Sequence, residues 1–161
     1  MKGRSRIKIE LTITDKVIEL IGWLSLLAIW VLAITSYSNL PDTIPIHYDG
    51  TGQIDRFGNK INILTLPLIA TILFVGITIA NRFPHIFNYP IKITEENTFR
   101  QYSNITRMNR YLKLIFVIIF GFIAYNTIES TNSLGFWFLP LTMGLLFTSL
   151  IYFVLKTVRT K

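Results

Sequence analysis

The chain contains no cysteine, and only nine of its 161 residues are acidic. The absence of cysteine excludes disulfides, thiolate catalysis and zinc or iron–sulfur sites built on cysteine ligands. Polar residues are also scarce for a water-soluble domain, because 51% of the residues are hydrophobic and the mean hydropathy is +0.47. The composition therefore predicts a membrane protein.

The hydrophobic residues gather in four runs, each long enough to cross about 30 Å of hydrocarbon as a helix. These runs occupy residues 17–36, 61–80, 112–128 and 134–155. Only two ionisable residues, Glu19 and Lys113, fall within or at the edge of a run. Ion-coupled transporters usually hold a charged group at mid-membrane depth, so the pattern argues against that class. We predict an all-α membrane protein in which residues 1–161 form a single integral-membrane domain with four transmembrane helices.

Positive charge is plentiful, with a formal net charge of +7, and in a soluble protein it would favour binding to nucleic acid. Here fourteen of the sixteen lysines and arginines lie at the N-terminus, in or beside segment 81–111, or at the C-terminus. The other two, Arg56 and Lys60, lie in loop 37–60. The positive-inside rule then predicts that both termini and segment 81–111 are cytoplasmic and that loop 37–60 faces outward. The expected partner is the lipid bilayer and not nucleic acid.

Loop 37–60 is too long for a plain connection, and loops of this length are often functional. Within it, Ile44, Ile46 and Tyr48 alternate before the sequence Asp-Gly-Thr-Gly at 49–52. Glycine and aspartate supply the backbone conformations that a tight reversal needs. We predict an ordered loop with a short β-hairpin, packed on the helices because an isolated two-stranded hairpin is only marginally stable.

His47, Asp49 and Asp55 are the chemically capable residues of this loop. A hairpin would bring His47 and Asp55 together across the turn, where the three side chains could hold a divalent cation, or a carboxylate could orient the imidazole as a proton acceptor. Structural roles carry more weight, because Asp49 suits a turn and Asp55 could pair with Arg56. We expect no catalytic residue, no bound metal and no cofactor. The residues expected to shape the loop or contact a ligand are Pro41, Pro45, His47, Tyr48, Asp49, Gly52 and Asp55.

Segment 81–111 is patterned as well. Thr94 suits a helix N-cap, followed by two glutamates in the first turn. Phe99, Tyr102 and Ile105 then recur at three-residue spacing, as on an amphipathic helix. We expect this helix to lie along the cytoplasmic surface or to continue into the third span.

The loop resembles the signature of a bacterial membrane family, the domain of unknown function sixteen-forty-eight. In that family, Pro-x-x-Ile-Pro-x-His-aromatic-Asn/Asp is followed by Gly, Asp, an aromatic residue, Gly and Lys. The matching residues here are Pro41, Ile44, Pro45, His47, Tyr48, Asp49, Gly52, Asp55, Phe57, Gly58 and Lys60. The same domain forms the front part of the SdpI-type immunity proteins, which protect a producing cell from its own secreted toxin. This chain is shorter and has little room for their additional C-terminal helices.

The resemblance implies a multipass protein of the bacterial plasma membrane, with toxin immunity or envelope-stress sensing as its role. We expect no enzymatic activity, and a peptide toxin or another envelope ligand as the partner of the outer loop. Two alternatives remain open. One is an accessory membrane subunit of an exporter or signalling complex, which would bind a protein partner through segment 81–111 at Phe99 and Tyr102. The other is a membrane metalloprotein that uses His47, Asp49 and Asp55.

Overall fold

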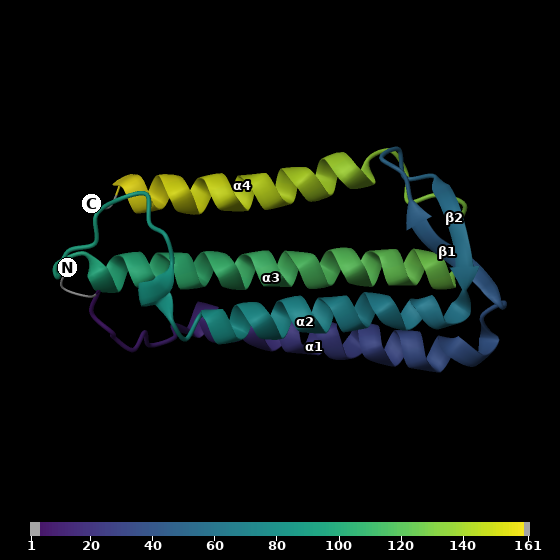
Figure 1. The fold of residues 1–161 in the computed structure, drawn as a ribbon, viewed down its shortest axis with the longest axis horizontal. Helices are drawn as coiled ribbons and strands as arrows, with labels where there is room; N and C mark the ends of the chain where they lie inside the picture. Colours follow the sequence, from purple (N-terminus) through teal and green to yellow (C-terminus); the bar gives the residue numbers. More distant parts are fainter. Residues whose placement is uncertain (1–3, 160–161) are drawn as a thin grey trace.

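The computed structural model describes residues 4–159 of the chain. It is mostly helical, with four long helices side by side and a small two-stranded sheet at one end (Figure 1). The long helices are α1 (Ile13–Ser36), α2 (Thr65–Ala80), α3 (Thr98–Ile128) and α4 (Phe138–Arg159). The prediction of four helices long and apolar enough to span a membrane is confirmed, with α2 counted together with the 3₁₀ turn η2 (Lys60–Leu64) that precedes it.

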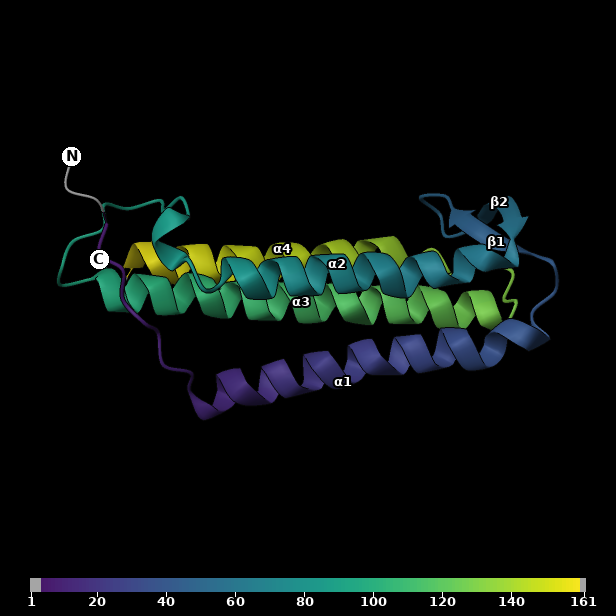
Figure 2. The same ribbon diagram turned by 60° about the horizontal axis from the view of Figure 1, so that its bottom comes forward.

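The sheet lies between α1 and α2 in the chain and consists of β1 (Thr43–Tyr48) and β2 (Ile54–Asn59), paired antiparallel. The predicted hairpin is therefore confirmed. The start of α1 and the end of α4 lie at the opposite end of the molecule from the hairpin (Figures 1 and 2). Between α2 and α3 the chain forms a loop with one short 3₁₀ turn, η3 (Pro84–Ile86), at that same opposite end.

The third helix is longer than the predicted span 112–128. It runs unbroken for 31 residues because no proline or glycine occurs between Thr98 and Gly121. The amphipathic stretch therefore continues into the third span and does not form a separate surface helix. The predicted helix start at Thr94 is wrong, because the Thr94 amide donates to Asn97 Oδ1 at 2.9 Å in a turn and the helix begins only after it.

Two other helices differ from the predicted spans at their ends. Helix α1 begins at Ile13 and not at residue 17, because Thr12 and Asp15 form a capping box that satisfies the first backbone amides. Helix α4 begins at Phe138 and not at 134, because Gly135 has a φ of +84° and belongs to the preceding turn. It also continues past 155 to Arg159.

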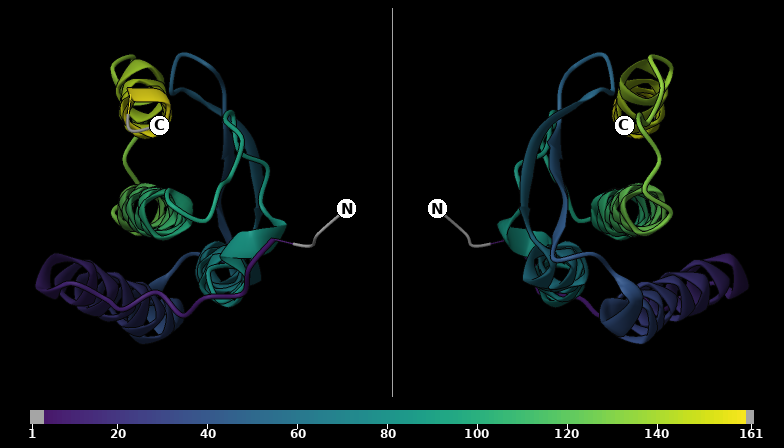
Figure 3. Two further views of the ribbon diagram at one scale, coloured as in Figure 1. Left: turned by 90° about the vertical axis from the view of Figure 1, so that its left-hand side faces the viewer. Right: turned by 90° about the vertical axis from the view of Figure 1, so that its right-hand side faces the viewer.

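Helix α3 is the centre of the arrangement. Helices α1 and α2 pack on one side of it and α4 packs on the other (Figure 3). Helix α4 makes few contacts with α1 or α2. Helices α1, α2 and α3 therefore pack together as one group, and α4 is added on the far side of α3 (Figure 3).

The apolar core joins the first three helices. Its buried members are Leu26, Ile29, Ala70, Phe74, Val117 and Ala124. Close approach of α1 and α2 requires glycine at position 22, because a Cβ there would lie 2.6 Å from the ring of Phe74. Many other large apolar side chains of the four helices are exposed, Leu24, Ile72 and Phe147 among them. An apolar exterior over helices of spanning length is the arrangement of a membrane protein.

Candidate functional site

The hairpin is irregular, and this irregularity positions its histidine. The register shifts between Pro45 and His47 and again between His47 and Tyr48, so the strands contain bulges. Bulges re-aim side chains relative to a regular ladder. His47 Nδ1 lies 2.6 Å from Asp55 Oδ1, as predicted for a hairpin, and both side chains are about half exposed, at 59% and 44%. The pair therefore lies on the surface of the hairpin.

The hairpin turn is organised by Asp49. Its Oδ1 atom accepts hydrogen bonds from the Thr51 hydroxyl at 2.7 Å, the Thr51 amide at 2.8 Å and the Gln53 amide at 3.0 Å. These bonds favour the charged carboxylate and hold the pKa of Asp49 below its usual range, with the Thr51 hydroxyl as the main cause. Gly52 follows with a φ of +81°, which favours glycine. Asp49 and Gly52 therefore shape the turn.

The three residues considered for a metal ion are not brought together as one set. His47 and Asp55 face each other, whereas the Asp49 carboxylate is committed to the turn. Across residues 4–159, no three side chains of His, Asp or Glu are grouped closely enough to hold a metal ion. The arrangement is a surface His–Asp pair next to a structural aspartate.

The tip of the hairpin is attached to the loop between α3 and α4. The Gly52 carbonyl accepts hydrogen bonds from the Leu134 amide and from the Ser133 hydroxyl, each at 2.8 Å. Gln53 also pairs with Ser133 as an isolated β-bridge. This attachment explains how a two-stranded hairpin, which would be marginal alone, keeps one position.

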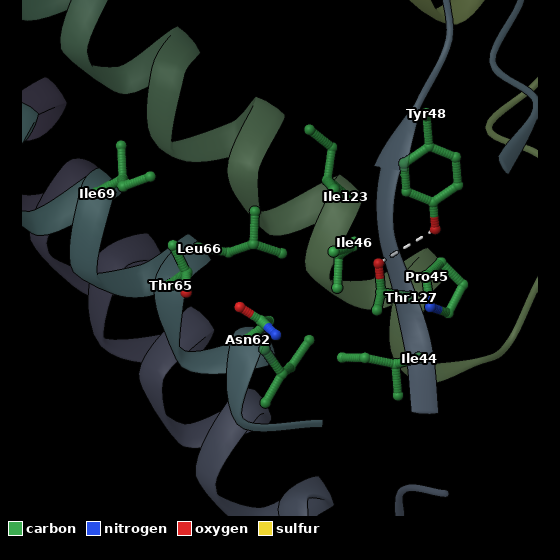
Figure 4. Close-up of a pocket in the computed structure, with 11 residues that line it drawn as sticks. Ile44, Pro45, Ile46, Tyr48, Asn62, Thr65, Leu66, Ile69, Ile123 and Thr127 are labelled. Atoms are coloured by element: carbon green, nitrogen blue, oxygen red, sulfur yellow. Dashed lines mark hydrogen bonds between the residues drawn. The ribbon is translucent and has the colours of Figure 1, made fainter. Parts of the chain in front are cut away.

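A second attachment joins β1 to α3. The hydroxyl groups of Tyr48 and Thr127 lie 3.1 Å apart and share a hydrogen bond (Figure 4). Below them, Ile44 packs in a small apolar cluster whose other buried members are Ala33, Leu40 and Ile63. The hairpin is thus fixed on the ends of the helices at two separate places.

A cavity of about 230 Å³ lies between the hairpin and the helices. Its walls come from β1, from η2 with the start of α2, and from the last turns of α3 (Figure 4). Most of the lining is aliphatic, and the polar members are Tyr48, Asn62, Thr65 and Thr127. An apolar pocket with a few polar groups is typical of a binding site for a small apolar ligand or part of one.

The predicted site residues divide between these features. Pro45 and Tyr48 line the cavity. Pro41 is exposed just before β1. Residues that the sequence did not indicate as part of the site are Asn62, Thr127 and Ser133. Asn62 and Thr127 lie near helix ends and Ser133 lies in the polar loop between α3 and α4, and only the fold brings them to the hairpin.

A charged cluster at the opposite end of the helices was also missed. Asp15 accepts hydrogen bonds from Arg107 at 2.8 and 3.0 Å, although both residues had been assigned to polar segments outside the spans. Glu19 pairs with Lys113 at 2.7 Å and with Arg110 at 3.1 Å. These ion pairs join α1 to α3.

Lys113 is the most enclosed member of this charged cluster. It is 1% exposed, donates to Thr78 Oγ1 at 2.6 Å, and lies 4.1 Å from the centre of the Phe74 ring. It therefore contacts α1 through Glu19 and α2 through Thr78 and Phe74. The sequence indicated a lysine near the interface, whereas the fold places it at the junction of three helices.

The two aromatic residues considered for partner docking differ in accessibility. Phe99 is exposed. Tyr102 is fully buried, stacks on Tyr89 with 5.6 Å between the ring centres, and donates to the Ser5 carbonyl at 3.2 Å. Tyr102 therefore has a structural role, and only Phe99 offers a surface at this position.

Comparison with known proteins extends the resemblance of the hairpin. Residues 24–71 match the model of the domain of unknown function (DUF1648), which covers part of α1, the hairpin and the start of α2. An uncharacterized protein of Archaeoglobus fulgidus is 28% identical over 116 residues, covering 67% of this chain and 63% of the relative. The chain thus spans less than two thirds of that relative. No solved structure matches this chain. The protein is a multipass membrane protein whose hairpin region is similar to this domain of unknown function.

Proposed function

We propose that the protein is a non-enzymatic receptor of the plasma membrane, which binds an apolar or amphipathic ligand at the hairpin. The observation that best supports this proposal is the cavity of about 230 Å³ beneath a hairpin that is fixed at two places. A preformed, mostly apolar cavity binds an apolar group without first ordering the chain, which lowers the cost of binding. The His47–Asp55 pair lies on the same hairpin, outside the lining of the cavity, and offers polar contacts to the rest of a ligand that extends over the hairpin.

Toxin immunity or envelope-stress sensing is the role that fits this proposal. A membrane-active peptide presents apolar side chains and polar backbone together, which suits a hairpin with an apolar cavity beneath it and a polar pair on its surface. The resemblance of the loop to the front part of the SdpI-type immunity proteins supports the same role. Under this proposal, the hairpin captures the peptide before it disturbs the bilayer.

The proposal requires the hairpin to face outward and both termini to face the cytoplasm. The distribution of lysine and arginine supports this orientation. Because the chain has no cysteine, a cysteine introduced at one position is the only thiol of the protein that a labelling reagent can modify. A membrane-impermeant maleimide should label Arg56→Cys on intact cells and Lys92→Cys only after lysis. The reverse pattern would refute the orientation.

Survival assays test the function directly. A sensitive bacterium expressing the protein is exposed to a panel of membrane-active peptide toxins, with all variants at matched membrane levels. We expect protection by the wild type, and loss of protection in His47→Ala and Asp55→Ala. Arg56→Ala serves as the control because it removes an exposed side chain from the same strand.

A second pair of variants tests the cavity. Ile69→Trp places a larger side chain in its lining, whereas Ile72→Trp makes the same change on the exposed face of the same helix. Protection should be lost only in Ile69→Trp. Protection from no toxin, or equal loss in both variants, would contradict the proposal. Capture of a stoichiometric partner that is released by Phe99→Ala would then favour the accessory-subunit role.

A further inference from the structure

The two strands of the hairpin differ in what lies against them. Strand β1 contacts α3 and η2, and it supplies the hairpin residues that line the cavity of about 230 Å³ (Figure 4). Strand β2 has β1 as its main partner, and its central residues Asp55, Arg56 and Phe57 are exposed. Within residues 4–159 the sheet has these two strands only. We call the side of β2 that faces away from β1 the outer edge.

The register of the hairpin determines which backbone groups lie on the outer edge. The Lys60 amide donates to the Asp42 carbonyl at 3.0 Å, so these two residues form a hydrogen-bonded pair. Hydrogen-bonded and non-hydrogen-bonded pairs alternate along an antiparallel ladder. Pro45 and Phe57 pair three positions further along, before the first register shift, so they form a non-hydrogen-bonded pair. The N–H and C=O groups of Phe57 therefore point away from β1, onto the outer edge.

Two other residues agree with this orientation. Asn59 lies two residues from Phe57 and has the same orientation, and its carbonyl accepts a hydrogen bond from Asn62 Nδ2 at 2.8 Å instead of from β1. Proline suits position 45, because an amide that points out of the ladder has no partner to lose. In the part of the chain that the structure describes, no hydrogen bond from outside the hairpin reaches the backbone of Phe57, whose side chain is 59% exposed.

The chain itself begins a third strand on the outer edge. Gln53, just before β2, pairs with Ser133 as an antiparallel bridge, and the Leu134 amide donates to the Gly52 carbonyl at 2.8 Å. The bridge is isolated, so this pairing does not continue along β2. The outer edge at Phe57 thus extends an existing pairing surface, and among residues 4–159 it has no strand of its own.

We propose that the outer edge of β2 binds an extended peptide, which pairs with it as a third strand. A backbone donor and acceptor on a strand edge are matched by the backbone of another extended chain. The N–H and C=O groups of Phe57 bond to the peptide backbone, and an apolar side chain of the peptide packs on the exposed Phe57 ring. This inference rests on the proposed function for the class of ligand, and it adds a binding surface outside the cavity.

The test uses full-length protein in lipid nanodiscs and a phage-displayed library of random peptides of about eight residues, long enough to cover β2. Peptides selected on the wild type are titrated against two variants. Phe57→Ala removes the ring and keeps the amide. Phe57→Pro also removes the amide, which takes no part in pairing with β1, and it should bind roughly tenfold more weakly than Phe57→Ala. In the wild type, hydrogen exchange of the Phe57 amide should slow when peptide binds.

Controls separate the outer edge from the cavity and from the fold of the hairpin. Exchange of the Leu134 amide shows whether the hairpin tip stays attached in Phe57→Pro. Ile69→Trp alters the cavity and should keep the peptide affinity within about twofold. Selection of no peptide, equal affinity of Phe57→Pro and Phe57→Ala, or unchanged exchange at Phe57 would each overturn the proposal.

The same titrations distinguish this proposal from the proposed function. Binding that is lost in Ile69→Trp and kept in Phe57→Pro would overturn the edge site and support the cavity. Binding that needs the Phe57 amide, together with no protection in the survival assay, would support the edge site and contradict the proposed function.

Discussion

The contact between Gly52 and the loop before α4 leaves no room for a side chain. An alanine Cβ at position 52 would lie 2.6 Å from the Gly135 carbonyl oxygen and 3.0 Å from its backbone N and C atoms. Gly52 also has a φ of +81°. We expect Gly52→Ala to detach the tip of the hairpin from this loop while the helices stay folded.

Two contributions set how much Gly52→Ala destabilises the attachment of the hairpin tip. The left-handed backbone costs a residue with a Cβ about 1–2 kcal/mol. Separation of the two backbones also breaks the two hydrogen bonds that the Gly52 carbonyl accepts, at about 1 kcal/mol each. Together these terms predict that the attachment becomes less stable by about 3–4 kcal/mol, or roughly 150- to 700-fold in its opening equilibrium.

Hydrogen exchange in lipid nanodiscs measures this directly. The Leu134 amide donates to the Gly52 carbonyl at 2.8 Å, so its protection should fall by about two orders of magnitude in Gly52→Ala. Gly50→Ala is the matched control, because its Cβ would meet only Leu139 Cδ2, at the ordinary contact distance of 3.8 Å. Unchanged protection in Gly52→Ala, or the same fall in Gly50→Ala, would refute the reasoning.

Three further predictions concern other contacts of the described chain. In a double-mutant cycle, Tyr48→Phe and Thr127→Val should show a coupling of about 1 kcal/mol in the free energy of unfolding, and strict additivity would show that their hydroxyl groups do not interact. Lys113→Met should lower the free energy of unfolding by about 3 kcal/mol, because it leaves Glu19 with one cation fewer. The control Lys92→Met changes an exposed lysine and should alter the free energy of unfolding by less than about 0.5 kcal/mol. A similar value for both variants would contradict the enclosed position of Lys113. Because the pKa of Asp49 is lowered in the folded turn, its carboxylate should stabilise the turn fully above about pH 4 and progressively less as the pH falls through the folded pKa; the NMR shift of the Gln53 amide should follow this titration in the wild type and stay flat in Asp49→Asn.

Local patterns in the sequence were enough to predict the hairpin. The alternating apolar residues from Ile44 to Tyr48, followed by a turn that starts at Asp49, predicted the hairpin. The pairing of His47 with Asp55 could be predicted because the two residues are close in sequence, on either side of that turn. These features depend on neighbours within a few residues. They could therefore be predicted without knowledge of the helix packing.

Contacts between distant segments could not be predicted in the same way. Asp15 and Arg107 are 92 residues apart, and each alone is typical of a charged flank outside a span. Thr127 and Tyr48 are 79 residues apart, and a single threonine at a helix end gives no indication of its partner. The position of α4 on the far side of α3 was missed for the same reason, since four apolar runs are compatible with several helix arrangements.

The attachment of Gly52 to Ser133 has a consequence for how the chain is made. These residues are 81 positions apart, so the hairpin leaves the ribosome before the loop that holds it. At about 5–20 residues per second, the hairpin waits roughly 4 to 16 seconds for that loop, and α4 must then follow it into the bilayer. A nascent chain stalled before Ser133 therefore carries a hairpin that can already contact α3 through Thr127 but whose tip is not yet attached. The second attachment, at the tip of the hairpin, forms only after the loop before α4 has been made.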